Sequence, residues 1–182
     1  MDDNFQYRLS ENQKNEIAQN LIDILQKDVE ITKLTKEFIS NWILTVGDEK
    51  RKAFFDVWDI VLKNYLPITR PVLFRACKRI GKKEKIASFT GRLECARRFS
   101  EGKGYLIICE TRETLQLDER FHKPGTYKHT FYPLIDVLKK AKNSVGWGFS
   151  KWLLDNYMGE DEYIMRTDLE NTHSFKWVKN DS

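Results

Sequence analysis

The chain has few cysteines and no long apolar run. Cys77, Cys95 and Cys109 lie far apart and form no C-x-x-C pair, so they predict reduced thiols rather than a disulfide framework. No apolar stretch approaches the roughly 20 residues that span a bilayer. The polar stretch MDDNFQYRLS at the N-terminus is unlike a signal peptide. We therefore expect a cytoplasmic protein, in its own cell or in a host cell, with no membrane partner.

Two common kinds of ligand site are also missing. His122, His129 and His173 show no metal-ligand spacing, and the cysteines do not complete one, so we expect no metal. The sequence contains no glycine motif of the P-loop or Rossmann kind. The glycine-rich stretch Gly102-Lys103-Gly104 is typical of a simple turn. This argues against a kinase or a dehydrogenase.

The composition supports a folded protein. The 182 residues are 41% hydrophobic and include five Trp and eleven Phe, which is enough for one compact domain or for one domain with a helical appendage. The formal net charge of +4 permits an anionic ligand or nucleic acid without requiring one.

Residues 1–66 predict an N-terminal helical segment. Ser10 and Gln13 form a capping box that opens a first helix. Apolar residues at helical spacing continue through a second helix, which ends near Gly47, and a third, which begins at Asp48 and ends at Pro67.

Residues 67–182 predict an α+β domain. Short strands are expected at the apolar runs, and the run 105–109 is long enough to be a central strand buried on both faces. A helix is expected from Leu93 to Phe99, with Cys95, Ala96 and Phe99 facing inward, and another from Phe131 to Lys142. The polar stretch 111–130 predicts a loop. The other expected strands are 72–74, 86–89, 163–165 and 175–178.

Three short motifs lie in or next to the expected strands and occur in a fixed order along the chain. Arg75 ends an apolar run, a hydroxyl pair (Ser88 and Thr90) comes next, and Glu160-Asp161-Glu162 precedes the run 163–165. Cleavage of the bond between nicotinamide and ribose in NAD passes through an oxocarbenium-like transition state. It requires a carboxylate to stabilise that charge, an arginine fork for the phosphates and a hydroxyl that orients the carboxylate. The three motifs contain these residue types.

The order and spacing of the motifs resemble the arginine–serine–glutamate class of mono-ADP-ribosyltransferases. That class includes clostridial-type toxins and transferases that phages inject to modify host proteins, and the resemblance covers residues 72 to about 178. It implies a split β-sandwich of two small sheets, with the co-substrate NAD in the cleft between them.

The resemblance also implies residue roles. Arg75 would contact the NAD phosphates and the nicotinamide ribose, and Ser88 would hydrogen-bond the catalytic Glu162, which in turn bonds the ribose 2′-hydroxyl. Thr90 would brace the same strand. Glu160 matches the position that accompanies arginine modification, and on a strand it would share a face with Glu162.

Three further features bear on the resemblance, two of them departures from the family. Ala76 stands where the family usually has glycine and the backbone meets the nicotinamide amide. The loop of about residues 152–159, with Trp152 and Tyr157, matches the target-recognition turn. The stretch between Cys109 and Glu160 is longer than typical.

Several alternatives remain open. The expected acceptor is a protein arginine, but a basic cluster (Lys82, Lys83, Lys85, Arg97 and Arg98) also allows RNA or DNA. An NAD glycohydrolase, or a non-catalytic binding module, would fit the same sequence. An antitoxin or inhibitor partner could dock on the helices before Pro67, although packing of those helices onto the rest of the chain is favoured. The acidic tripeptide alone would indicate only a solvated turn.

Overall fold

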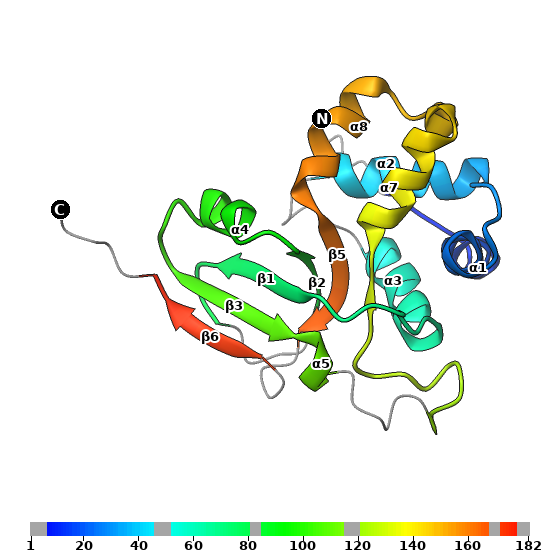
Figure 1. The fold of residues 1–182 in the computed structure, drawn as a ribbon. Helices are drawn as coiled ribbons and strands as arrows, with labels where there is room; N and C mark the ends of the chain where they lie inside the picture. Colours follow the sequence, from blue (N-terminus) through cyan, green and yellow to red (C-terminus); the bar gives the residue numbers. More distant parts are fainter. Residues whose placement is uncertain (1–6, 46–51, 81–84, 115–120, 168–171, 178–182) are drawn as a thin grey trace, which may run out of the picture.

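The computed structural model describes residues 7–45, 52–80, 85–114, 121–167 and 172–177. Within these ranges the protein combines helices with one antiparallel sheet (Figure 1), which confirms the predicted α+β class. The predicted helix boundary at residues 47–48, Lys82 and Lys83 of the basic cluster, and Val178 lie outside the described residues. No helix in these ranges is both long enough and apolar enough to cross a membrane.

Three helices occupy the first third of the described chain, as the sequence predicts. They are α1 (Glu11–Lys27), α2 (Lys33–Leu44) and α3 (Lys52–Asn64). The capping box is present, because Ser10 Oγ accepts a bond from the Gln13 N–H at 3.2 Å while Gln13 Oε1 accepts from the Ser10 N–H at 2.9 Å.

The strands form one six-stranded sheet in the order β4-β5-β2-β1-β3-β6, with every neighbouring pair antiparallel. The expectation of two separate small sheets is therefore wrong for the described strands. The sheet has two halves, β4-β5-β2 and β1-β3-β6, which are joined by the pairing of Phe74 on β1 with Thr90 on β2. The strands are β1 (Val72–Cys77), β2 (Lys85–Thr90), β3 (Tyr105–Glu110), β4 (Phe131–Tyr132), β5 (Glu162–Thr167) and β6 (His173–Lys176).

The helices after β2 differ in part from expectation. The predicted helix from residue 131 begins later, as α7 (Leu134–Asn143), because Phe131 and Tyr132 pair with β5 and are fully buried there. A short helix, α5, occupies the start of the predicted loop. The remaining helical elements are α4 (Leu93–Ser100), α5 (Thr111–Thr114), η2 (Val145–Gly148), α8 (Lys151–Tyr157) and η3 (Met158–Glu160).

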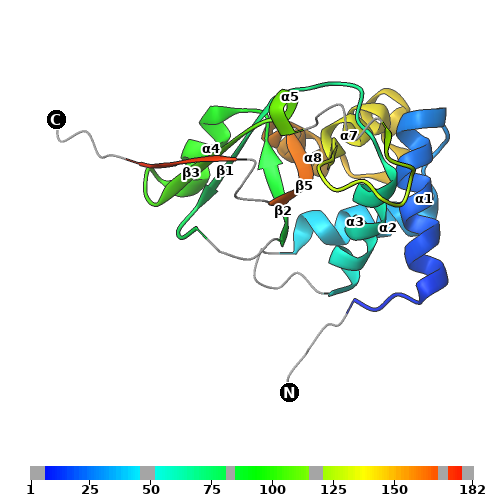
Figure 2. The same cartoon turned by 90° about the horizontal axis from the view of Figure 1, so that it is seen from below.

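The main hydrophobic core crosses the boundary that the sequence analysis placed between residues 66 and 67. Trp42 of α2 and Phe54 and Trp58 of α3 pack in one cluster with Tyr132 and with Ile164 of β5. Figure 2 shows these helices gathered with α7 and α8 at the β5 end of the sheet, with β6 at the opposite end. The N-terminal helices thus pack onto the sheet-bearing part of the chain, as the sequence favours.

A second, smaller cluster includes Leu73, Phe89 and Met165. Ile164 and Met165 are adjacent on β5 but belong to different clusters, because successive side chains on a strand point to opposite faces. β5 is therefore anchored on both sides, which fixes the start of that strand, where Glu162 lies.

Candidate active site

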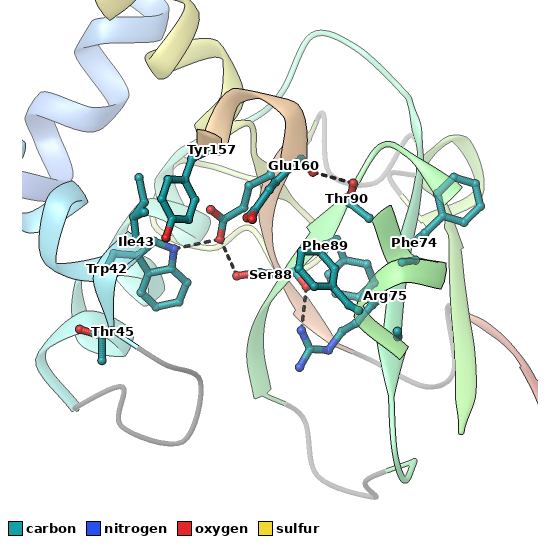
Figure 3. A pocket seen from close by; sticks show the side chains of 14 residues that line it. Trp42, Ile43, Thr45, Phe74, Arg75, Ser88, Phe89, Thr90, Tyr157 and Glu160 are labelled. Carbon is teal, nitrogen blue, oxygen red and sulfur yellow. Dashed lines mark hydrogen bonds between the residues drawn. The ribbon is translucent and has the colours of Figure 1, made fainter. Parts of the chain in front are cut away.

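A cavity of about 360 Å³ is formed where the end of α2, the strands β1 and β2, the helix α4 and the start of β5 meet (Figure 3). It contains most of the side chains that the sequence singled out. Its walls are Trp42, Ile43, Thr45, Phe74, Arg75, Ala76, Ser88, Phe89, Thr90, Ala96, Phe99, Tyr157, Glu160 and Glu162.

The carboxylate of Glu162 is held by two donors. Ser88 Oγ donates to Glu162 Oε1 at 2.6 Å, and the indole Nε1 of Trp42 donates to the same oxygen at 3.0 Å. Ser88 reaches it because β2 and β5 are paired in register, with Thr90 opposite Glu162. Among the described residues, Glu162 Oε2 accepts no hydrogen bond, so one carboxylate oxygen remains for a ligand.

Glu160 reaches the cavity by a different route from the one predicted. It ends the 3-10 helix η3, and Asp161 then adopts a left-handed conformation with φ 48° before β5 begins at Glu162. The idea that Glu160 and Glu162 share a face of one strand is therefore wrong. The turn at Asp161 nevertheless brings both glutamates to the wall of the same cavity.

Thr90 fixes this turn. Its Oγ1 donates to the Glu160 carbonyl at 2.7 Å and accepts from the Arg92 N–H at 3.1 Å. The next residue, Gly91, donates its N–H to the Asp161 carbonyl at 3.1 Å. The end of β2 is thus bonded to the turn that carries both glutamates, and Thr90 braces that turn.

Arg75 supplies a positive charge from β1, the neighbour of β2 in the sheet. Its Nη1 donates to the Ser88 carbonyl at 2.7 Å, and burial lowers the pKa of the guanidinium from its usual value. An arginine keeps its charge in proteins in spite of such a shift. No carboxylate in the described residues lies within ion-pair distance of Arg75, so the charge is available to an anion. Ala76 follows it along β1 and also lines the cavity.

The predicted target-recognition loop is mostly helical. Residues 152–157 lie in α8, which Ser150 caps by accepting from the Leu153 N–H at 3.1 Å. Tyr157 lines the cavity, whereas Trp152 does not and is 62% exposed. The two rings meet edge to face with centroids 6.1 Å apart, which places Trp152 beside the cavity.

The sequence did not predict all of the residues that line the cavity. Trp42 is one of the apolar residues at helical spacing in the predicted second helix, and it is buried in the core. Nothing in its local pattern indicates a contact with a residue 120 positions later. Phe99 was expected to face inward but is 58% exposed, while Cys95 and Ala96 are buried as predicted. The ring of Phe99 forms part of the cavity wall instead.

The cavity therefore joins an oriented carboxylate, a second carboxylate and an available guanidinium, with aromatic walls. Such a set suits a ligand that carries anionic groups and develops positive charge during reaction. Across the described ranges, no three His, Cys, Asp or Glu side chains gather closely enough to hold a metal ion. Comparisons with protein-family models, with curated proteins and with solved structures found no significant match.

Proposed function

We propose that this protein is an NAD-dependent mono-ADP-ribosyltransferase, which moves ADP-ribose from NAD to a macromolecule, with a protein arginine as the acceptor. The observation that carries the proposal is the carboxylate of Glu162, fixed by two donors on one oxygen, in the same cavity as the guanidinium of Arg75. The family resemblance of the motifs supports it, since Arg75, Ser88 and Glu162 meet in space.

The proposed reaction begins with heterolysis of the bond between C1′ of the ribose and the nicotinamide nitrogen. Nicotinamide leaves with the electron pair and becomes neutral, and positive charge develops on the ribose. Glu162 stabilises that charge and accepts a bond from the 2′-hydroxyl at Oε2. Carboxylates have this role in glycoside cleavage, which shares the oxocarbenium-like transition state. Ser88 keeps the carboxylate oriented for this contact.

Arg75 would bind the diphosphate. A guanidinium presents paired donors in a plane that matches phosphate oxygens. Burial of Arg75 strengthens such a contact, because less water competes for the charge. The cavity volume of about 360 Å³ lies near the lower end of the range for ligand pockets, roughly 300–1,000 Å³, so it suits the nicotinamide ribose end of NAD.

Glu160 would act on the acceptor. It lines the cavity beside Glu162, and a second carboxylate there can orient an incoming arginine and take its proton as the new C1′–N bond forms. Tyr157, with Trp152 at the edge, would contact the target around that arginine. A transferase of this kind fits a toxin-type protein or a phage effector that acts in the cytoplasm of its own or a host cell.

The test uses labelled NAD. The purified protein is incubated with it and a bacterial lysate, with and without nuclease, beside E162Q, E160Q and the control E94Q; Glu94 is exposed on α4 and does not line the cavity. We expect nuclease-resistant labelled protein with wild type and E94Q, none with E162Q, and free nicotinamide but no labelled protein with E160Q.

The other outcomes identify the alternatives. A nuclease-sensitive label would make nucleic acid the acceptor, and free nicotinamide without label from wild type would indicate a glycohydrolase. If wild type yields neither product, the enzymatic proposal is wrong and a binding role takes its place.

A further inference from the structure

The side chain of Trp42 links the N-terminal helices to the candidate catalytic carboxylate. Trp42 lies near the end of α2, is 1% exposed, and donates its indole N–H to Glu162 Oε1 at 3.0 Å. Figure 3 shows Trp42 and Arg75 on opposite sides of Ser88, the other donor to this carboxylate. Trp42 therefore both packs in the hydrophobic core and contacts an ionisable side chain that lines the cavity.

The two donors to Glu162 differ in rigidity. The Ser88 hydroxyl can rotate and can also accept a bond, whereas an indole N–H only donates and points where the ring points. The ring of Trp42 is fixed by edge-to-face contacts with Phe54, Phe55 and Trp58, with centroids 5.8, 6.2 and 5.6 Å away. The direction of the N–H is therefore set by the helical core.

We propose that Trp42 is a positioning residue for the transfer reaction proposed above, on which this inference rests. By holding Oε1 together with Ser88, the indole fixes the rotation of the carboxylate and leaves Oε2 for the ribose 2′-hydroxyl. Because an indole N–H can only donate, Oε1 keeps a partner of fixed direction on the side of the helices.

The N-terminal helical segment contributes more than Trp42 to the cavity. Ile43 and Thr45, next to Trp42, also line the cavity. The helices of residues 1–66 thus complete the active site, and their hydrophobic core acts on the reaction through one hydrogen bond.

The experiment compares two substitutions in one aromatic cluster. W42F keeps an aromatic ring but removes the donor to Glu162. W58F is the matched control, because Trp58 is fully buried, contacts Trp42, and has an indole nitrogen without a hydrogen-bond partner in the described residues. NAD kinetics and the melting temperature (Tm) are measured for both variants and for wild type.

We expect W42F to lower kcat about 10- to 100-fold, which corresponds to roughly 1.4–2.7 kcal/mol of transition-state stabilisation. The KM for NAD should change by less than about 3-fold, because the contact acts on the reacting centre rather than on general binding. W58F should lower Tm but leave kcat within about 2-fold of wild type, because Phe at position 58 keeps an aromatic ring against Trp42, and Phe54 and Phe55 still hold the indole. In an E162Q background, W42F should cause no further loss, because its effect passes through Glu162.

Distinct results overturn distinct claims. Equal losses of kcat in W42F and W58F, or an unchanged kcat in W42F, would overturn the positioning role alone. A wild-type protein that turns over no NAD would overturn the proposed function and this role with it.

If W42F does not fold, wild type and E162Q decide the question by NMR. The indole N–H resonance of Trp42 should move when Glu162 becomes neutral, while that of Trp58 stays. An unmoved Trp42 resonance would overturn the inference.

Discussion

Replacement of Thr90 by Val tests whether the turn before β5 positions the two glutamates. The change removes one hydroxyl with almost no change in shape, at a site that is 5% exposed. It leaves the Glu160 carbonyl without the donor that lies 2.7 Å away, and it removes the acceptor of the Arg92 N–H. The bond from the Gly91 N–H to the Asp161 carbonyl and the bond from the Asp161 N–H to the Met158 carbonyl remain.

The expected cost has two parts. Loss of a part-buried hydrogen bond costs about 0.5–1.5 kcal/mol, and for a chain of this size each kcal/mol lowers Tm by roughly 2–4 °C. A looser turn also lets the glutamates move, and a misplacement of about 1 Å in a catalytic group can cost on the order of 100-fold in rate. We therefore predict a kcat that falls roughly 10- to 100-fold.

The assay measures nicotinamide release and thermal unfolding in parallel, with T111V as the control. Thr111 is also a fully buried threonine just after a strand, and its hydroxyl donates to the Pro71 carbonyl, but it does not line the cavity. T111V should lose a similar amount of Tm and keep its activity. Equal activity in T90V and T111V would refute the claim that this turn positions the glutamates.

Three further predictions concern binding, the same turn and acid stability. R75K should raise the KM for NAD about 10-fold or more, measured by initial rates, because a hydrogen bond to a charged group contributes about 1.5–3 kcal/mol and lysine lacks the planar fork. G91A should lower activity, because a Cβ there would crowd both Asp161 (Oδ2 at 2.1 Å and Cγ at 3.1 Å) and the ring of Tyr163 (Cε2 at 3.3 Å), so that two side chains at the turn must shift. G159A, with nothing within 4 Å, should be neutral; equal effects would contradict this. Burial raises the pKa of Asp59, but its ion pairs with two basic neighbours outweigh burial and hold that pKa below its usual value. D59N should therefore lower Tm at pH 7. The difference from wild type should begin to shrink below about pH 3.9, where an aspartate protonates in the unfolded chain, and should vanish only below the lower pKa of the folded state; a constant difference would contradict this.

The parts of the site that follow from local sequence were predictable. Arg75 and Ser88 each lie in a short apolar run whose strand character is evident in the residues themselves. The capping box at Ser10 predicts its helix because a cap depends only on neighbours within one turn. These features require no knowledge of how distant segments pack.

The parts that depend on packing were not predictable. Phe131 and Tyr132 begin a helix-like pattern but form β4, because pairing with β5 outweighs their local preference. Glu160 lies in a 3-10 turn because Asp161 adopts a left-handed conformation, which a Glu-Asp-Glu sequence does not reveal. The contact of Trp42 with Glu162 depends on the packing of α2 against β5. The single sheet depends on the pairing of Phe74 with Thr90.

The most direct test of the central claim is nicotinamide release from NAD by the purified protein, compared with E162Q and with E94Q. The account predicts release by wild type and E94Q, and a loss of about 100-fold or more in E162Q, because the amide keeps the shape of the side chain but not the charge that stabilises the transition state. Equal release by wild type and E162Q, or no release by any of the three proteins, would contradict it.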